Sequence, residues 1–269
     1  MPANAANKST QTAVYALITG ASTGIGRALA ECFAQRGIPL ILSASPRSAP
    51  ALAALAAQWQ AQYGIAVHGH CVDLGQEGAA QTLATWVDAQ GLEVGYLVNN
   101  AGFGICEQAL QDYDPARFAQ MLQVNMLAPS RLISHFLPPM VARGSGRVLN
   151  VSSIAGYIYP HYQQGAYAAT KAYMVSLSES MAQDLHGTGV TCTHLAPGPV
   201  RSAFFASAGL AKARPLAMSA EAVAQAGFAA MMAGKPRCIP GWGNKLAAFG
   251  ARISPSRRLV AWLAKQALH

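Results

Sequence analysis

The sequence predicts an α/β protein built as a doubly wound parallel sheet, and three observations carry this prediction. Short apolar runs rich in β-branched residues alternate with longer Ala- and Leu-rich stretches, as in successive βαβ units. Glycines break the chain between these stretches, for example at Gly37, Gly64 and Gly91. No internal repeat, low-complexity tract or linker divides the chain, so we expect a single domain over residues 1–269.

Each expected strand is a short apolar run that ends at a turn-forming residue. The first, AVYALIT, leads into a glycine-rich turn and a helix, and the later strands follow helical stretches with apolar faces. The expected strands are 13–19, 38–44, 65–71, 94–100, 147–152, 190–196 and a stub near 238–240. The expected helices are 24–36, 50–62, 77–90, 115–143, 164–187 and 219–234.

The composition favours a globular enzyme with a well-buried core. Apolar residues make up 52% of the chain and charged residues 11%, which excludes a disordered or fibrous protein. The five cysteines are scattered without a C-x-x-C pair, which indicates a reducing compartment. The polar N-terminus lacks a signal-peptide core, and no uncharged apolar run reaches the roughly 18 residues of a membrane span. We therefore expect a cytoplasmic protein.

The net charge of +8 lies entirely in the last quarter of the chain. Residues 1–200 hold nine Lys or Arg against ten Asp or Glu, whereas residues 201–269 hold ten against one, Glu221. No recognised nucleic-acid motif accompanies this charge, so we expect no nucleic-acid partner. His68 and His70 flank Gly69 on one strand face, but the histidines show no metal-ligand spacing and we expect no metal.

A glycine-rich turn follows the first strand in TGASTGIG, residues 19–26. Gly20, Gly24 and Gly26 stand in the strand–turn–helix context of a dinucleotide site. Glycines let the backbone approach a pyrophosphate, which amide groups and the positive helix end would hold. A tight turn alone would use the same glycines, so the motif needs support from the rest of the chain.

Three further motifs follow later strands. VNNAG (98–102), NVSSIAG (150–156) and APGPV (196–200) each end a strand, and the carboxyl ends of parallel strands share one edge of the sheet. YAATK (167–171) places Tyr167 and Lys171 one helical turn apart on one face, where an ammonium favours the phenolate form of a tyrosine. This convergence predicts a site at that edge.

Together these motifs resemble the short-chain dehydrogenase/reductase family over about residues 13–205. The resemblance implies a Rossmann-type fold and hydride transfer between a nicotinamide cofactor and a carbonyl or alcohol carbon. Tyr167 resembles the general acid/base, and Lys171 the residue that lowers its pKa and holds the nicotinamide ribose. Ser153 resembles the hydroxyl that steadies the substrate oxygen, and Asn125 the residue that anchors a water. Fourteen residues separate Ser153 from Tyr167, one more than expected, and Ser152 is the competing serine.

The resemblance also implies a cofactor-binding set. Asn99, Ala101 and Gly102 would line the cofactor floor, and Asp73 would meet the adenine edge. The complete set is Gly20, Ser22, Thr23, Gly24, Ile25, Gly26, Arg47, Asp73, Leu74, Asn99, Ala101, Gly102, Tyr167, Lys171, Pro197, Gly198 and Val200.

In the family that the chain resembles, the residues at the end of the second strand distinguish NAD(H) from NADP(H). Here that strand is followed by Ser45 and Arg47, with no acidic residue in that loop to grip a ribose 2′-hydroxyl. Arg47 offers a charge-assisted contact to a 2′-phosphate. The alternative is that Arg47 is a solvated loop residue without a role in binding. We expect NADP(H) rather than NAD(H).

Residues 13–200 thus form the expected cofactor-binding and catalytic core, and residues 201–217 the segment that covers the substrate. Tyr159, His161, Phe103 and Phe204-Phe205 suggest an apolar, aromatic pocket. Tyr173 lies about 600° around the helix from Tyr167, so we expect it in the core or at an interface.

The spacing of apolar and basic residues in the tail, residues 241–269, predicts an amphipathic helix that is broken at Pro255. Trp242, Leu246, Phe249 and Ile253 recur at helical spacing, as do Leu259, Trp262, Leu263 and Gln266. We expect the apolar stripe to dock on the domain or on a partner subunit; peripheral membrane contact is the less favoured alternative.

Two functions remain open on the sequence alone. The favoured one is an NADP-dependent reductase or dehydrogenase acting on a small carbonyl or alcohol, as a homo-oligomeric dimer or tetramer. The alternative is a non-catalytic nucleotide-sensing protein on the same fold, which would not need the set Asn125, Ser153, Tyr167 and Lys171.

Overall fold

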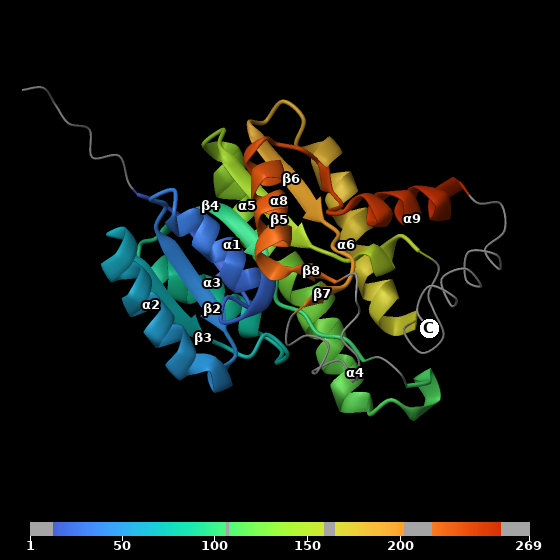
Figure 1. Cartoon of the computed structure of the whole chain (residues 1–269). Helices are drawn as coiled ribbons and strands as arrows, with labels where there is room; N and C mark the ends of the chain where they lie inside the picture. The colour runs from blue at the N-terminus through green and yellow to red at the C-terminus, as the bar shows by residue number, and fades with distance from the viewer. Residues whose placement is uncertain (1–12, 106–107, 159–164, 202–216, 254–269) are drawn as a thin grey trace, which may run out of the picture.

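A seven-stranded parallel sheet forms the centre of the computed structural model, which describes residues 13–105, 108–158, 165–201 and 217–253 (Figure 1). The strand order is β3-β2-β1-β4-β5-β6-β9, and every neighbouring pair is parallel. The order reverses between β1 and β4, which is where doubly wound sheets bind their ligands. The strands are β1 (Val14–Thr19), β2 (Leu40–Ala44), β3 (Val67–Cys71), β4 (Glu93–Asn99), β5 (Gly146–Val151), β6 (Val190–Leu195) and β9 (Arg237–Cys238). The expected fold class is confirmed.

Helices cover both faces of this sheet, because successive strand residues point to opposite faces. Ala16 and Ile18 of β1 belong to one apolar core, and Leu17 between them belongs to the other. The first core is closed by α1 (Gly24–Ala34), α2 (Ala49–Tyr63) and α8 (Ala220–Met232). The second is closed by α3 (Ala79–Ala89), α5 (Ala128–Ala142) and α6 (Gly165–Asp184).

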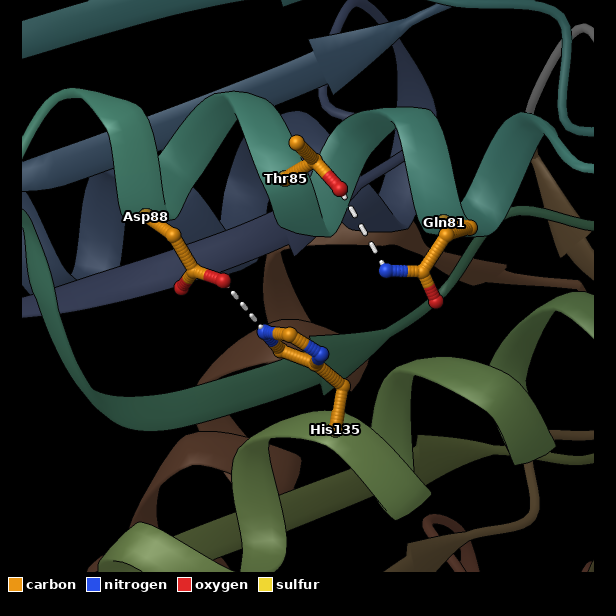
Figure 2. A network of polar contacts seen from close by, with 4 residues as sticks. All are labelled: Gln81, Thr85, Asp88 and His135. Carbon is orange, nitrogen blue, oxygen red and sulfur yellow. Dashed lines mark hydrogen bonds and ion pairs between the residues drawn. The ribbon is translucent and has the colours of Figure 1, made fainter.

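A polar contact joins α3 to α5 at the surface of the second core. Figure 2 shows the His135 ring of α5 meeting the Asp88 carboxylate of α3, with Nε2 and Oδ2 separated by 2.8 Å. Gln81 and Thr85 bond one turn earlier along α3. Both contacts are exposed, so they contribute little beside the apolar packing beneath them.

The expected helix 115–143 is confirmed over Pro115–Ala142, and it contains one π-helical turn that was not predicted. The chain forms α4 (Pro115–Leu122), a π-helical turn (Gln123–Leu127) and then α5. Pro129 has no N–H, and in a regular helix its ring would clash with the Asn125 carbonyl four residues earlier. The widened turn accommodates this proline and places Asn125 within the irregular segment.

Two short strands bracket the segment expected to cover the substrate. β7 (Val200–Arg201) pairs in parallel with β8 (Met218–Ser219), which brings the two ends of this segment together. Residues 202–216, with Phe204 and Phe205, lie outside the described residues. Tyr159 and His161 lie outside them as well.

The described part of the tail is one helix, α9 (Trp242–Ile253). The side chains of Trp242, Leu246 and Phe249 are 79%, 55% and 61% exposed, whereas Ala248 is buried. Within the described residues, the apolar stripe therefore does not dock on the protein's own domain; the expected alternative, docking on a partner subunit, stays a prediction. Pro255 and the second predicted stripe lie beyond the described residues.

The two strand histidines have aromatic neighbours. His70 stacks on Trp86 and His68 meets the edge of Tyr15. Within the described ranges, no three His, Cys, Asp or Glu side chains gather as a metal site would require. Across the same ranges, no helix is long and apolar enough to cross a membrane.

A pair of glycines before β6 tests the packing of this end of the sheet. Gly187 and Gly189 both have left-handed backbone, so replacement of either by Ala costs about 1–2 kcal/mol. Only at Gly189 would the added Cβ also meet backbone, 2.0 Å from the Gly144 carbonyl oxygen. We expect Gly189→Ala to lower the free energy of unfolding by about 1–3 kcal/mol more than Gly187→Ala in urea titrations. Equal losses would show that the turn before β6 is not tightly packed.

Candidate active site

The turn between β1 and α1 has the shape of a phosphate cradle. Gly20 and Gly24 have positive φ angles, and a Cβ on Gly26 would lie 2.2 Å from the Gly20 carbonyl oxygen. Thr23, the N-cap of α1, makes no side-chain bond to the amides of the first helical turn. These N–H groups are thus not capped by Thr23 and suit an anion. The residues fit the pyrophosphate of a dinucleotide.

Asn100 holds this turn against the end of β4, and it is absent from the predicted cofactor-binding set. Its side-chain Nδ2 donates to the carbonyl oxygens of Thr19 (2.9 Å) and Gly20 (3.2 Å). The Thr19 hydroxyl in turn accepts from the amides of Asn100 and Ala101. The available signal was the position of Asn100 within NNAG, directly after a strand that neighbours β1.

The side chain of Asn99 turns into the sheet, away from the expected cofactor floor. This side chain is buried and donates to Asn150 Oδ1 at 2.9 Å, and Asn150 donates to the Ser178 hydroxyl. Asn99 therefore supports the floor from within the sheet. Ala101 and Gly102 lie beyond the end of β4, at the edge where the prediction placed them.

Lys171 is fully buried beside Tyr167 on α6. Its Nζ donates to the Val151 carbonyl oxygen at 3.1 Å and lies 5.8 Å from the centroid of the Tyr167 ring. Burial lowers the pKa of the Lys171 ammonium to about 8, because desolvation disfavours its charged form. A Cβ on Gly102 would come within 3.2 Å of this Nζ, so the bare glycine backbone leaves room for the lysine.

Asn125 lies in the π-helical turn, and its side chain makes three hydrogen bonds. Its Nδ2 donates to the Phe103 carbonyl oxygen and to Thr170 Oγ1, and its Oδ1 accepts from the Phe103 amide. Thr170 donates in turn to the carbonyl oxygen of Tyr167. Because both N–H protons of the side chain are used, a water anchored by Asn125 would meet its Oδ1 or its main chain.

The two serines after β5 differ in their burial and in their hydrogen bonds. Ser152 is buried and donates to the Leu195 carbonyl oxygen at 3.1 Å. Ser153 is only partly buried and accepts from the Ala155 amide, a contact that leaves its O–H proton for donation. The geometry favours Ser153 over Ser152 as the hydroxyl that meets a substrate oxygen.

The structure also locates three other residues that the sequence singled out, Asp73, Arg47 and Tyr173. Asp73 after β3 accepts from the Gly75 amide and the Gln76 side chain, which fixes its carboxylate. Arg47 is exposed in a single 3-10 turn, Pro46–Ser48, two residues beyond β2. Tyr173 contacts the Ser130 hydroxyl of α5 at 2.8 Å, in agreement with its expected structural role.

The loop after β6 is braced from several sides. The Pro197 carbonyl oxygen accepts from the Ile154 amide next to Ser153, and the Pro199 carbonyl oxygen accepts from Met218. A Cβ on Gly198 would lie 2.3 Å from Asn244 Oδ1 of α9. Asn244 therefore rests directly on the loop predicted to bind the cofactor, a contact that no sequence motif indicated.

Comparison with known proteins decides the family. A sequence profile described as "short chain dehydrogenase" matches residues 14–213. The chain belongs to the short-chain dehydrogenase family.

Two solved structures of family members resemble this short-chain dehydrogenase along most of both chains. A Sphingobium yanoikuyae enzyme in complex with NADPH has a TM-score of 0.80 and 28% identity over 89% of this chain and 93% of its own. A Burkholderia phymatum enzyme in complex with NAD has a TM-score of 0.79 and 26% identity over 91% of this chain and 97% of its own.

Among sequence relatives, sulfoacetaldehyde reductase 2 of Chromohalobacter salexigens is 34% identical over 70% of this chain and 73% of its own. These similarities establish an oxidoreductase with a nicotinamide cofactor. Whether this chain prefers NAD(H) or NADP(H), and which substrate it takes, must be argued from its own residues.

The burial of Lys171 predicts a distinctive dependence of stability on pH. The folded protein releases the lysine proton near pH 8 and the unfolded chain only near pH 10.5, so the unfolded chain binds more protons between these values. The contribution of Lys171 to stability therefore rises with pH across this window, by up to about 3 kcal/mol. Denaturant titrations of the wild type minus those of Lys171→Met should show this rise. A difference that stays flat from pH 7 to 11 would contradict the buried ammonium.

Proposed function

We propose that this protein is an NADP(H)-dependent oxidoreductase of the short-chain family that interconverts a carbonyl and a secondary alcohol, with Tyr167 as the general acid/base. The observation that carries this proposal is the burial of Lys171 beside the Tyr167 ring on α6, with its Nζ bonded to the carbonyl oxygen of Val151, the last residue of β5. Hydride transfer is the chemistry that the nicotinamide supplies when bound.

The residues of the chain would handle the oxygen of the substrate. In reduction, negative charge develops on that oxygen, and the Tyr167 phenol donates a proton to it. The Ser153 hydroxyl donates a hydrogen bond to the same oxygen and steadies it. The Lys171 ammonium favours the phenolate that remains, and the bond from Thr170 to the Tyr167 carbonyl holds that turn of α6 in place.

The cofactor would lie across the switch point between β1 and β4. Gly20, Ser22, Thr23, Gly24, Ile25 and Gly26 would hold its phosphates, and Asp73 with Leu74 its adenine. Ala101 and Gly102 would form its floor, and Lys171 would hold the nicotinamide ribose. The nicotinamide side would be held by Pro197, Gly198 and Val200.

The buried lysine argues against a non-catalytic nucleotide binder. Removing an ammonium from water costs free energy, and the described contacts of Lys171 are a carbonyl oxygen and an aromatic ring. A protein that only bound nucleotide could use such a cation for the ribose, but it would gain nothing from placing that cation beside the phenol of Tyr167.

Replacing Tyr167 by Phe removes the acidic proton and keeps the ring that packs with Ile105, Tyr113 and Met121. We expect turnover to fall by about 10²–10⁴ or more, with the dissociation constant of NADPH within about threefold of wild type. The measurement is NADPH absorbance with a panel of ketones, aldehydes and acyl thioesters, beside calorimetric cofactor binding. Tyr173→Phe on the same helix is the matched control and should stay active. Full activity of Tyr167→Phe would exclude it as the acid.

The proposed 2′-phosphate contact is tested at Arg47. We expect NADPH to bind more tightly than NADH, and Arg47→Ala to reduce this preference by about 1–3 kcal/mol, the worth of a hydrogen bond to a charged group. Because Arg47 is exposed, the substitution should leave the stability of the apoprotein unchanged. Calorimetric titration with both cofactors measures the effect. Equal affinities in the wild type, or an unaltered preference in the variant, would place the contact elsewhere.

A further inference from the structure

The exposed stripe of α9 is the largest group of solvent-facing apolar side chains on any one described element. Trp242, Leu246 and Phe249 are all more than half exposed, and α9 extends outward from the central sheet (Figure 1). At about 100° per residue, the three side chains fall within an arc of roughly 60° on the helix surface. Soluble domains rarely leave such a stripe uncovered unless it meets something.

The opposite side of α9 is the one that holds it to the domain. Ala248 is buried, and Asn244 rests on Gly198 while donating to the Pro240 carbonyl oxygen at 2.7 Å. These two positions lie about 120° to 160° around the helix from Trp242. The helix is thus fixed on one side and presents its apolar stripe outward on the other.

The charge around the stripe identifies the kind of surface that it fits. Lys245 lies next to the stripe and is exposed, and no acidic residue occurs after Glu221 in the sequence. The chain from residue 235 onward carries seven Lys or Arg, at positions 235, 237, 245, 252, 257, 258 and 265. This charge repels a second copy of the same tail and attracts an anionic surface.

The size of the stripe also argues against a protein partner. A stable protein interface takes roughly 800 Å² and 20–30 residues from each side, far more than three side chains on one helix. Burial of Trp, Phe and Leu in the headgroup region needs no matching pocket, and flanking lysines add attraction to acidic lipids. Trp is itself favoured at the boundary between water and lipid.

We propose that α9 is an interfacial helix that docks this protein reversibly on an anionic lipid bilayer. Trp242, Leu246 and Phe249 enter the headgroup layer, and Lys245 pairs with acidic lipid headgroups. Because Asn244 rests on the loop after β6, docking brings the candidate active site close to the bilayer surface.

Vesicle sedimentation of the full-length protein tests this assignment. The vesicles contain about 30% phosphatidylglycerol in phosphatidylcholine, and the buffer holds about 0.15 M salt, where charges are screened over roughly 8 Å. The test variant is Trp242→Ser/Phe249→Ser. The matched control is Leu110→Ser/Val141→Ser, which removes two exposed apolar side chains outside α9. Melting temperatures of both variants confirm that they fold.

Wild type and control should partition onto the anionic vesicles to the same extent, within about twofold, and the α9 variant at least about tenfold less. Binding should weaken on neutral vesicles and at high salt. Three results would overturn the proposal: no binding of the wild type, equal binding of the α9 variant, or a wild-type oligomer that the α9 variant alone dissociates. Capture by an acidic protein without lipid binding would overturn it as well.

Discussion

The hydrogen bonds between the first glycine turn and the end of β4 are the constraint on which the candidate site depends. The Asn100 side chain donates to the carbonyl oxygens of Thr19 and Gly20, and the Thr19 hydroxyl accepts from the amides of Asn100 and Ala101. Four bonds thus lock two neighbouring strand ends together at the point where the strand order reverses. Gly26 must be bare because its Cβ would displace this same asparagine.

A second constraint is the placement of a cation where water is excluded. Lys171 is tolerated because the Val151 carbonyl and the Tyr167 ring face it and because Gly102 leaves it space. Its surroundings are rigid: Asn125 ties Phe103 to Thr170, and Thr170 ties back to Tyr167. A charge held in this way acts on the neighbouring phenol without first having to reorganise, which is the condition for electrostatic catalysis.

Much of this arrangement was predictable because strand and turn signals are local. The six long strands begin and end within two residues of their expected positions, and the glycine turn lies where its motif placed it. The direction of Asn99 was also available, since Leu97 and Asn99 must share one face of β4. Pro129 likewise signalled an irregular turn near Asn125.

By contrast, the contact of Asn244 with Gly198 joins segments far apart in the chain, and no local pattern encodes it. The periodicity of the tail predicted the stripe on α9 but not what would cover it, because amphipathicity specifies a face and not its partner.

The central claim is that this site transfers hydride to carbon and is not merely a nucleotide pocket. Its most direct test is to react the protein with NADPH deuterated at the transferable ring position and with the best carbonyl of a substrate panel, and to locate the label by mass spectrometry. Deuterium is expected on the new carbinol carbon of the product, with none exchanged from solvent. Tight NADPH binding without label transfer to any carbonyl class would contradict it.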